Sequence, residues 1–131
     1  MELPTKSQRM PARVMSELVE PFAVHSRLTG ESYRVRFSHL WVAISTRHSD
    51  TVDCKFLVNG RGVIVGLAHL GYVAFRERTG RQLSDPEAAA LAAAYLRDCL
   101  EDDRLGDRTL LYVSPEEVVG WAARLGYVAA R

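Results

Sequence analysis

The residues best suited to metal chemistry gather near the middle of the sequence: His48, Asp50 and Asp53, with His39 and His69 as further candidates. Imidazole and carboxylate groups suit zinc, manganese or iron, but a site needs several convergent ligands, and this spacing matches no established pattern. A polar turn capped by Asp50 is the commoner use of such residues. We therefore expect no metal ion and no cofactor, and we keep a small metal-dependent or hydrolytic enzyme as one alternative.

The two cysteines, Cys54 and Cys99, both stand in segments predicted to be regular structure. A nucleophilic cysteine needs a stabilised thiolate, whereas the alternation around Cys54 points its side chain into a buried sheet face. The sequence also lacks a phosphate-binding glycine loop, a Gly-x-Ser-x-Gly elbow and paired Cys-x-x-Cys motifs. We therefore do not expect an enzyme, and the absence of a disulfide framework favours a reducing compartment.

Three arginines surround Gly80: Arg76, Arg78 and Arg81. Their forked guanidinium groups could hold a phosphate or a carboxylate, although Glu77 interrupts the run. Positive side chains near the C-terminus of a helix are also favoured by the helix dipole. We expect these arginines to serve the helix end, and we keep an anion-binding site as the alternative.

Residues 22–28 and 33–37 alternate apolar with polar side chains on either side of a Thr-Gly-Glu-Ser turn, which predicts a hairpin. If the four-residue loop sets the register, Leu28 lies opposite Tyr33 and one face of the hairpin is apolar. That face belongs to the core.

The outward face of this hairpin is expected to be basic. Its candidate binding residues are His25, Arg27, Arg34 and Arg36, with Arg47 adjacent. In the expected register Arg27 opposes Arg34 and His25 opposes Arg36, and like charges directly opposed on a sheet repel each other. We therefore expect an anionic partner at this face.

The charge of the chain is divided unevenly. Residues 1–84 hold 12 Lys/Arg against 7 Asp/Glu, and residues 85–131 hold 5 against 9. This polarity fits a basic binding face, a head-to-tail contact between copies through the acidic segment 98–107, or an acidic helix lying on a basic sheet. We favour the last. The three acids at 101–103 are notable, because negative charge near a helix C-terminus is unfavourable.

The remaining strands are predicted over residues 40–46, 52–58, 63–67 and 109–113. The first is apolar on both faces, which indicates an interior strand. The next two flank Asn59-Gly60, the strongest short hairpin signal, because both turn residues need positive φ.

Helical spacing is predicted over 12–20, from His69 to Thr79, from Asp85 through Cys99, and after Pro115 to Leu125. The last two helices open with Ser-x-x-Glu capping boxes. The expected fold is α+β: an antiparallel sheet of about five or six strands, including two hairpins, packed on one face by two or three helices.

We expect one domain over residues 1–131, with a flexible N-terminal segment over 1–11, since composition and length are those of a single globular unit. Residues 1–10 lack the apolar stretch of a signal peptide, and no run approaches the roughly 18 apolar residues of a membrane span. We therefore expect a cytoplasmic protein with no membrane contact.

For the function we expect a non-enzymatic binding or regulatory module that acts through protein contacts, either with an acidic partner or as a homodimer. A nucleic-acid-binding protein that uses the basic two-stranded ribbon is the alternative. The sequence pI of about 7.8 and the lack of evident stacking aromatics beside the arginines argue against nucleic acid.

Overall fold

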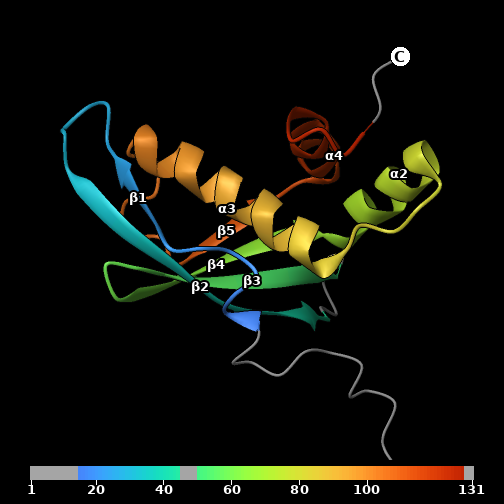
Figure 1. Ribbon diagram of the computed structural model, residues 1–131, viewed down its shortest axis with the longest axis horizontal. Coiled ribbons are helices and arrows are strands. Elements are labelled where there is room, and N and C mark those ends of the chain that lie inside the picture. Colours follow the sequence, from blue (N-terminus) through green and yellow to red (C-terminus); the bar gives the residue numbers. More distant parts are fainter. Residues whose placement is uncertain (1–14, 45–49, 129–131) are drawn as a thin grey trace, which may run out of the picture.

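The structure is a computed structural model that describes residues 15–44 and 50–128 (Figure 1). In chain order its elements are β1 (Phe22–His25), β2 (Ser32–Ala43), β3 (Thr51–Val58), β4 (Arg61–Ala68), α2 (His69–Thr79), α3 (Asp85–Glu101), β5 (Leu110–Val113) and α4 (Pro115–Arg124). The expected α+β class is confirmed.

The strands form one sheet in the order β1-β2-β3-β4-β5. The first three pairings are antiparallel, but β4 and β5 run parallel, so the prediction of a purely antiparallel sheet was wrong. The reason lies in the connection, because α2 and α3 carry the chain back across the sheet before β5 begins in the direction of β4. The sheet is therefore mixed.

Strand β2 takes the place of two predicted strands, over residues 33–37 and 40–46. Its register against β3 shifts between Phe37 and His39, so the interruption in the alternation is a bulge within one strand. The described structure therefore has fewer strands than the segments predicted from the sequence.

The second half of β2 is an edge. Strand β1 pairs only with Ser32–Val35, so among the described strands the rest of β2 has a neighbour on the β3 side alone. The prediction of an interior strand from Leu40 was wrong, and Val42 is 54% exposed.

The first hairpin has a longer loop than predicted. Val24 pairs with Tyr33, so the predicted pairing of Leu28 with Tyr33 was wrong. The strands are displaced by an even number of residues, and each side chain keeps the face that alternation predicts. Val24 and Val35 are accordingly buried in the core.

The displaced register changes the neighbours of the basic residues. Arg34 pairs with Ala23, and His25 pairs with Ser32. Arg27 lies in the loop, so the predicted repulsion between directly opposed like charges is absent from this hairpin.

The second hairpin and the helix ends follow the sequence signals. Asn59 and Gly60 have φ of 51° and 84°, as the turn requires. Both capping boxes are formed, with Ser84 and Ser114 at the N-caps of α3 and α4. Gly80 ends α2 in the left-handed conformation with φ of 76°.

The three described helices lie on one face of the curved sheet (Figure 1). Helix α3 lies along the middle of that face, and α2 and α4 lie side by side at one end. Between these layers is the core, whose largest fully buried side chains include Phe56, Phe75, Leu91 and Leu96. No described helix covers the opposite face of the sheet.

The predicted helix over 12–20 lies partly outside the described residues. From Met15 to Glu20 the chain forms turns, with the amide of Leu18 donating to the carbonyl of Met15 at 2.9 Å. Met15 is buried in the core cluster. Within the described parts of the chain, no helix has the length and apolar character needed to cross a membrane.

Candidate functional site

We call the face of the sheet opposite the helices the open face. Its residues follow from strand alternation, because side chains next to core-facing ones point the other way. The charged and aromatic residues of the open face are His25, Arg34, Arg36, His39, Trp41, Asp53, Lys55 and Tyr112.

Arg34 and Arg36 are the exposed cations of β2. They stand two residues apart on the same face, about 7 Å along the strand. Both line an open hollow of about 620 Å³, to which Ala23 and Leu57 also contribute. Neither guanidinium forms an ion pair with a carboxylate of the described residues. Within residues 15–44 and 50–128, no carboxylate therefore offsets the charge of either arginine.

A second hollow, of about 520 Å³, adjoins Arg36. Glu17, Glu20 and Phe37 also line it. Because two carboxylates border this hollow, an anion is favoured in the hollow beside Arg34 instead.

Two glycines of β4 allow charged side chains of β3 to lie against the sheet. A Cβ at Gly62 would stand 3.3 Å from Cε of Lys55, and one at Gly66 would stand 3.0 Å from Oδ1 of Asp53. Asp53 also accepts a hydrogen bond from Oγ1 of Thr51 at 2.7 Å. Asp53 is the one carboxylate that the described strands carry, so cations dominate the open face.

Aromatic rings share this face with the cations. The rings of His39 and Trp41 are stacked, with centroids 5.0 Å apart and an interplanar angle of 29°. At the β5 edge of the sheet, on the same open face, Tyr112 is 54% exposed. Trp41 is half-buried and lies on the open face.

Arg27, a predicted member of the basic face, is paired within the chain. Its Nη2 lies 2.9 Å from Oε1 of Glu101, and its Nε lies 3.6 Å from Oδ1 of Asp102. Arg104 likewise pairs with Asp98 at 2.7 Å and with Asp102 at 3.6 Å. Arginines of the same chain therefore occupy the acidic segment at the end of α3.

Asp103 completes this contact between the hairpin and α3. It accepts hydrogen bonds from the hydroxyl of Tyr33 at 2.7 Å and from the hydroxyl of Ser26. The Ser26 hydroxyl in turn accepts the amides of Leu28 and Thr29, both at 3.1 Å. The bonds from Ser26 and Tyr33 lower the pKa of Asp103, and hydrogen bonding to Asp103 raises the pKa of Tyr33 to about 12. The β1–β2 loop is thereby fixed to α3.

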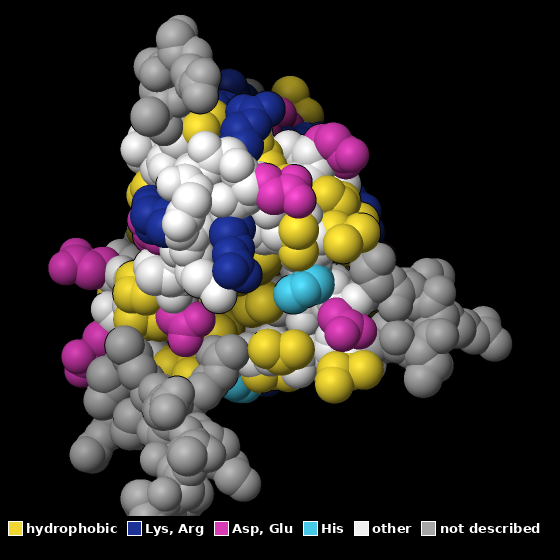
Figure 2. All heavy atoms as spheres, turned by 90° about the vertical axis from the view of Figure 1, so that its right-hand side faces the viewer, with side chains coloured by type: hydrophobic (Ala, Val, Ile, Leu, Met, Phe, Trp, Pro, Cys, Tyr) yellow, Lys and Arg dark blue, Asp and Glu magenta, His cyan; other side chains and the backbone are white. Residues whose placement is uncertain are grey.

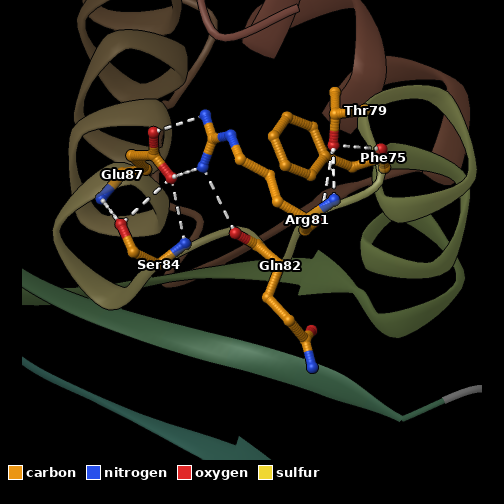
Figure 3. Close-up of polar contacts among 6 residues, drawn as sticks. All are labelled: Phe75, Thr79, Arg81, Gln82, Ser84 and Glu87. Carbon is orange, nitrogen blue, oxygen red and sulfur yellow. Dashed lines mark hydrogen bonds and ion pairs between the residues drawn. The ribbon is translucent and has the colours of Figure 1, made fainter.

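The arginines around Gly80 have separate surroundings. Figure 3 shows Nη1 and Nη2 of Arg81 each donating to the carboxylate of Glu87 at 2.9 Å, beside the ring of Phe75. Arg76 and Arg78 are exposed in the last turn of α2. At this end of the molecule, Figure 2 shows Lys and Arg side chains separated by uncharged surface and by Asp and Glu. Arg81 therefore joins α2 to α3.

The metal-binding candidates that lie within the described residues do not form a cluster. Among residues 15–44 and 50–128 no three His, Cys, Asp or Glu side chains gather closely enough to hold a metal ion. His48 lies outside these residues, as does Arg47 of the predicted basic face. The carbonyl of Asp50 accepts the amide of His69 at 2.8 Å, while Asp53 lies on the open face.

Both cysteines are free and buried. Burial raises the pKa of the Cys54 thiol and, to a smaller degree, that of Cys99. Neither thiol has the thiolate character that a nucleophile needs.

The fold and the open face define a small α+β protein with a basic and aromatic sheet surface. No protein-family model, curated protein or solved structure matches this chain.

Three open-face residues were neither predicted binding residues nor metal candidates: Trp41, Lys55 and Tyr112. The alternation of β3 signals Lys55 directly, since its neighbours on both sides point inward. Tyr112 follows in the same way from the short strand β5. Trp41 required knowledge of the bulge, because only the shifted register shows which face it occupies.

Proposed function

We propose that this chain is a small non-enzymatic binding or regulatory module whose open face holds a partner with an anionic surface. The observation that carries the proposal is the contrast between the arginines of one hairpin. Arg27 is neutralised by the end of α3, whereas Arg34 and Arg36 face a hollow without a carboxylate partner among the described residues.

The rest of the open face supports the same choice of partner. His25 and Lys55 add basic groups near the two arginines, and Asp53 is engaged by Thr51. A partner with an acidic surface gains charge complementarity at this face, which favours encounter and sets orientation.

An acidic protein surface is the partner expected from the sequence, and self-association remains a proposal beside it. The acidic segment of a second copy is less well suited to this role, because Arg27 and Arg104 already hold its carboxylates. A cytoplasmic location is also part of the proposal, and the two free thiols support it.

The proposal is tested with the full chain on immobilised poly-glutamate, eluted with salt. We expect wild-type protein to be retained and the Arg34→Glu, Arg36→Glu variant to pass through. The matched control is Arg76→Glu, Arg78→Glu, which makes the same change in net charge on exposed arginines of α2. We expect this control to be retained nearly as well as wild type.

Equal loss of retention in both variants would show that net charge alone governs the contact, and would contradict a binding face on the sheet. Failure of the wild-type protein to be retained at low salt would contradict the proposal as a whole.

A further inference from the structure

The open face combines cations with aromatic rings in a defined arrangement. Trp41 lies in one row across the strands with Asp53, Gly66 and Tyr112. The two aromatic positions are three strand spacings apart, about 14 Å. The stack of His39 on Trp41 fixes one ring plane, while Tyr112 is exposed beside Gly66, over which the carboxylate of Asp53 lies.

These two kinds of side chain match the two repeating features of a nucleic-acid strand. Arg34 and Arg36 offer forked donors to phosphate oxygens, and the rings of Trp41 and Tyr112 offer surfaces on which bases stack. Every base has a π face, so such a surface binds without strong sequence preference. An acidic protein would use the arginines but would leave the aromatic surfaces unexplained.

The geometry favours a single strand over a duplex. Bases in a duplex are stacked on one another and do not reach a flat sheet surface, whereas unpaired bases can be splayed onto aromatic side chains. A ribbon that enters a groove would need a protruding hairpin with free cations. The β1–β2 loop is instead fixed to α3 through Asp103, and the charge of Arg27 is paired there.

We propose that the open face binds single-stranded nucleic acid, with phosphates held at Arg34 and Arg36 and bases stacked on Trp41 and Tyr112. This inference rests on the proposed function, because the same arginines hold the anion. Lys55, lying over Gly62 on the path between β2 and β5, supplies a further cation to the backbone.

The test is fluorescence anisotropy of the full chain with labelled single-stranded DNA and RNA of mixed sequence, and with a duplex of the same sequence. We expect both single strands to bind more tightly than the duplex. Arg34→Gln with Arg36→Gln reduces the magnitude of the slope of log affinity against log salt by about 1.4, because each phosphate contact on a single strand contributes about 0.7. Tyr112→Leu and Trp41→Leu each lower the affinity roughly 5- to 100-fold and leave that slope unchanged.

Arg76→Gln with Arg78→Gln is the matched control for the arginine pair, and its affinity and slope stay at the wild-type values. Tyr112→Leu is the decisive aromatic variant, because Tyr112 is exposed and outside the core cluster. Unchanged affinity in a folded Tyr112→Leu protein, or equal binding of duplex and single strand, overturns the inference.

The poly-glutamate experiment separates the two proposals. Retention on poly-glutamate without binding of any single strand overturns the nucleic-acid inference and leaves the proposed function standing. Absence of both contacts overturns both.

Discussion

Asp103 shows how a single residue can resolve what appears as a mismatch in the sequence. Its φ of 54° is unusual for a non-glycine residue, and the run of acids there is unfavourable at a helix C-terminus. The hydroxyls of Ser26 and Tyr33 both donate to its carboxylate. The negative charge is therefore used to hold a hairpin that lies far away in the sequence.

The pKa of Tyr33 reports on this contact. Its pKa of about 12 lies above the ordinary value of 10.0, and the hydrogen bond to Asp103 is the largest cause. Because the pKa is raised by folding, this stabilising contribution is complete below pH 10 and is lost as the pH rises from about 10 to about 12. We expect Asp103→Asn to move the Tyr33 pKa back toward 10, measured by NMR titration of labelled tyrosine.

Glu31→Gln is the control for that titration. Glu31 also lies near the Tyr33 hydroxyl, at 3.4 Å, but it contributes less to the raised pKa. We expect a smaller shift than with Asp103→Asn. A Tyr33 pKa that is equally insensitive to both substitutions would contradict the assigned hydrogen bond.

Residue types alone predicted part of the candidate site. Arg34 and Arg36 could be placed on an outward face by alternation, and the structure puts them there. Arg27 could not be distinguished from them in the sequence. Its ion pairs depend on where Glu101 and Asp102 lie after folding. Long-range ion pairs of this kind leave no local signal in a single sequence.

Between the elements α2 and α3, Arg81 and the first capping box form one connected group (Figure 3). Hydrogen bonding from Arg81, followed by bonds from Ser84, lowers the pKa of Glu87 to about 2 from 4.5. A carboxyl group whose pKa is lowered by folding stabilises the fold at pH values above its pKa in the unfolded chain. This contribution is lost as the pH falls from about 4.5 to about 2.

We expect Glu87→Gln to lower stability at neutral pH and to flatten its dependence on pH over that range, measured by denaturant unfolding. Gln still satisfies a capping box, so the loss reports mainly on the pairing with Arg81. Glu117→Gln is the matched control, since Glu117 holds the same position in the second box, with no arginine pair among the described residues. An equal acid response in both variants would contradict a special role for Arg81.

The packing of α2 against α4 depends on one glycine. A Cβ at Gly71 would stand 2.6 Å from Cβ of the buried Val118, too close for any real contact. We expect Gly71→Ala to cost about 1–3 kcal/mol of unfolding free energy through overpacking, despite the better helix propensity of alanine. Denaturant unfolding measures this loss.

Gly120→Ala is the control, because a Cβ at Gly120 of α4 meets nothing within 4 Å. We expect this substitution to be neutral or stabilising by up to about 1 kcal/mol. Adding Val118→Gly to Gly71→Ala should recover part of the loss in a double-mutant cycle, because glycine removes the Val118 Cβ as well as its two methyl groups. Additive losses would contradict direct contact between the two positions.

Elements with local signals were predicted well, and those fixed by distant contacts were not. Asn59-Gly60 and the two capping boxes specify their own geometry, and all three are formed. The loop of the first hairpin takes its length from contacts of Ser26 with Asp103, which alternation does not contain. The parallel pairing of β5 depends on the crossover through α2 and α3, and its four-residue pattern is equally compatible with either direction.

At the scale of the whole molecule, ion pairs within the chain neutralise part of the charge difference between its basic and acidic halves. The basic N-terminal part meets the acidic end of α3 through Arg27, which fits the interpretation of an acidic helix lying on a basic sheet. The open face remains as the basic surface that this pairing does not use. The molecule thus separates a structural use of charge from the binding use that we propose.

This separation predicts how copies of the chain behave toward one another. A head-to-tail contact of the open face with the acidic segment would have to displace Arg27 and Arg104 from carboxylates they hold at 2.9 and 2.7 Å. Exposed ion pairs are individually weak. Exchanging these pairs for similar pairs between two copies would therefore gain little binding free energy and would add the entropy cost of association. We therefore expect any self-association to use another surface, and sedimentation velocity to give the same species at low and high salt.

Arg27→Ala with Arg104→Ala sharpens the measurement, because it frees the acidic segment while leaving Arg34 and Arg36 in place. We expect salt-sensitive association to increase in this variant relative to wild type, since the carboxylates become available to the open face of another copy. A wild-type dimer that dissociates with salt, together with no gain in the variant, would show that copies associate through charges other than these.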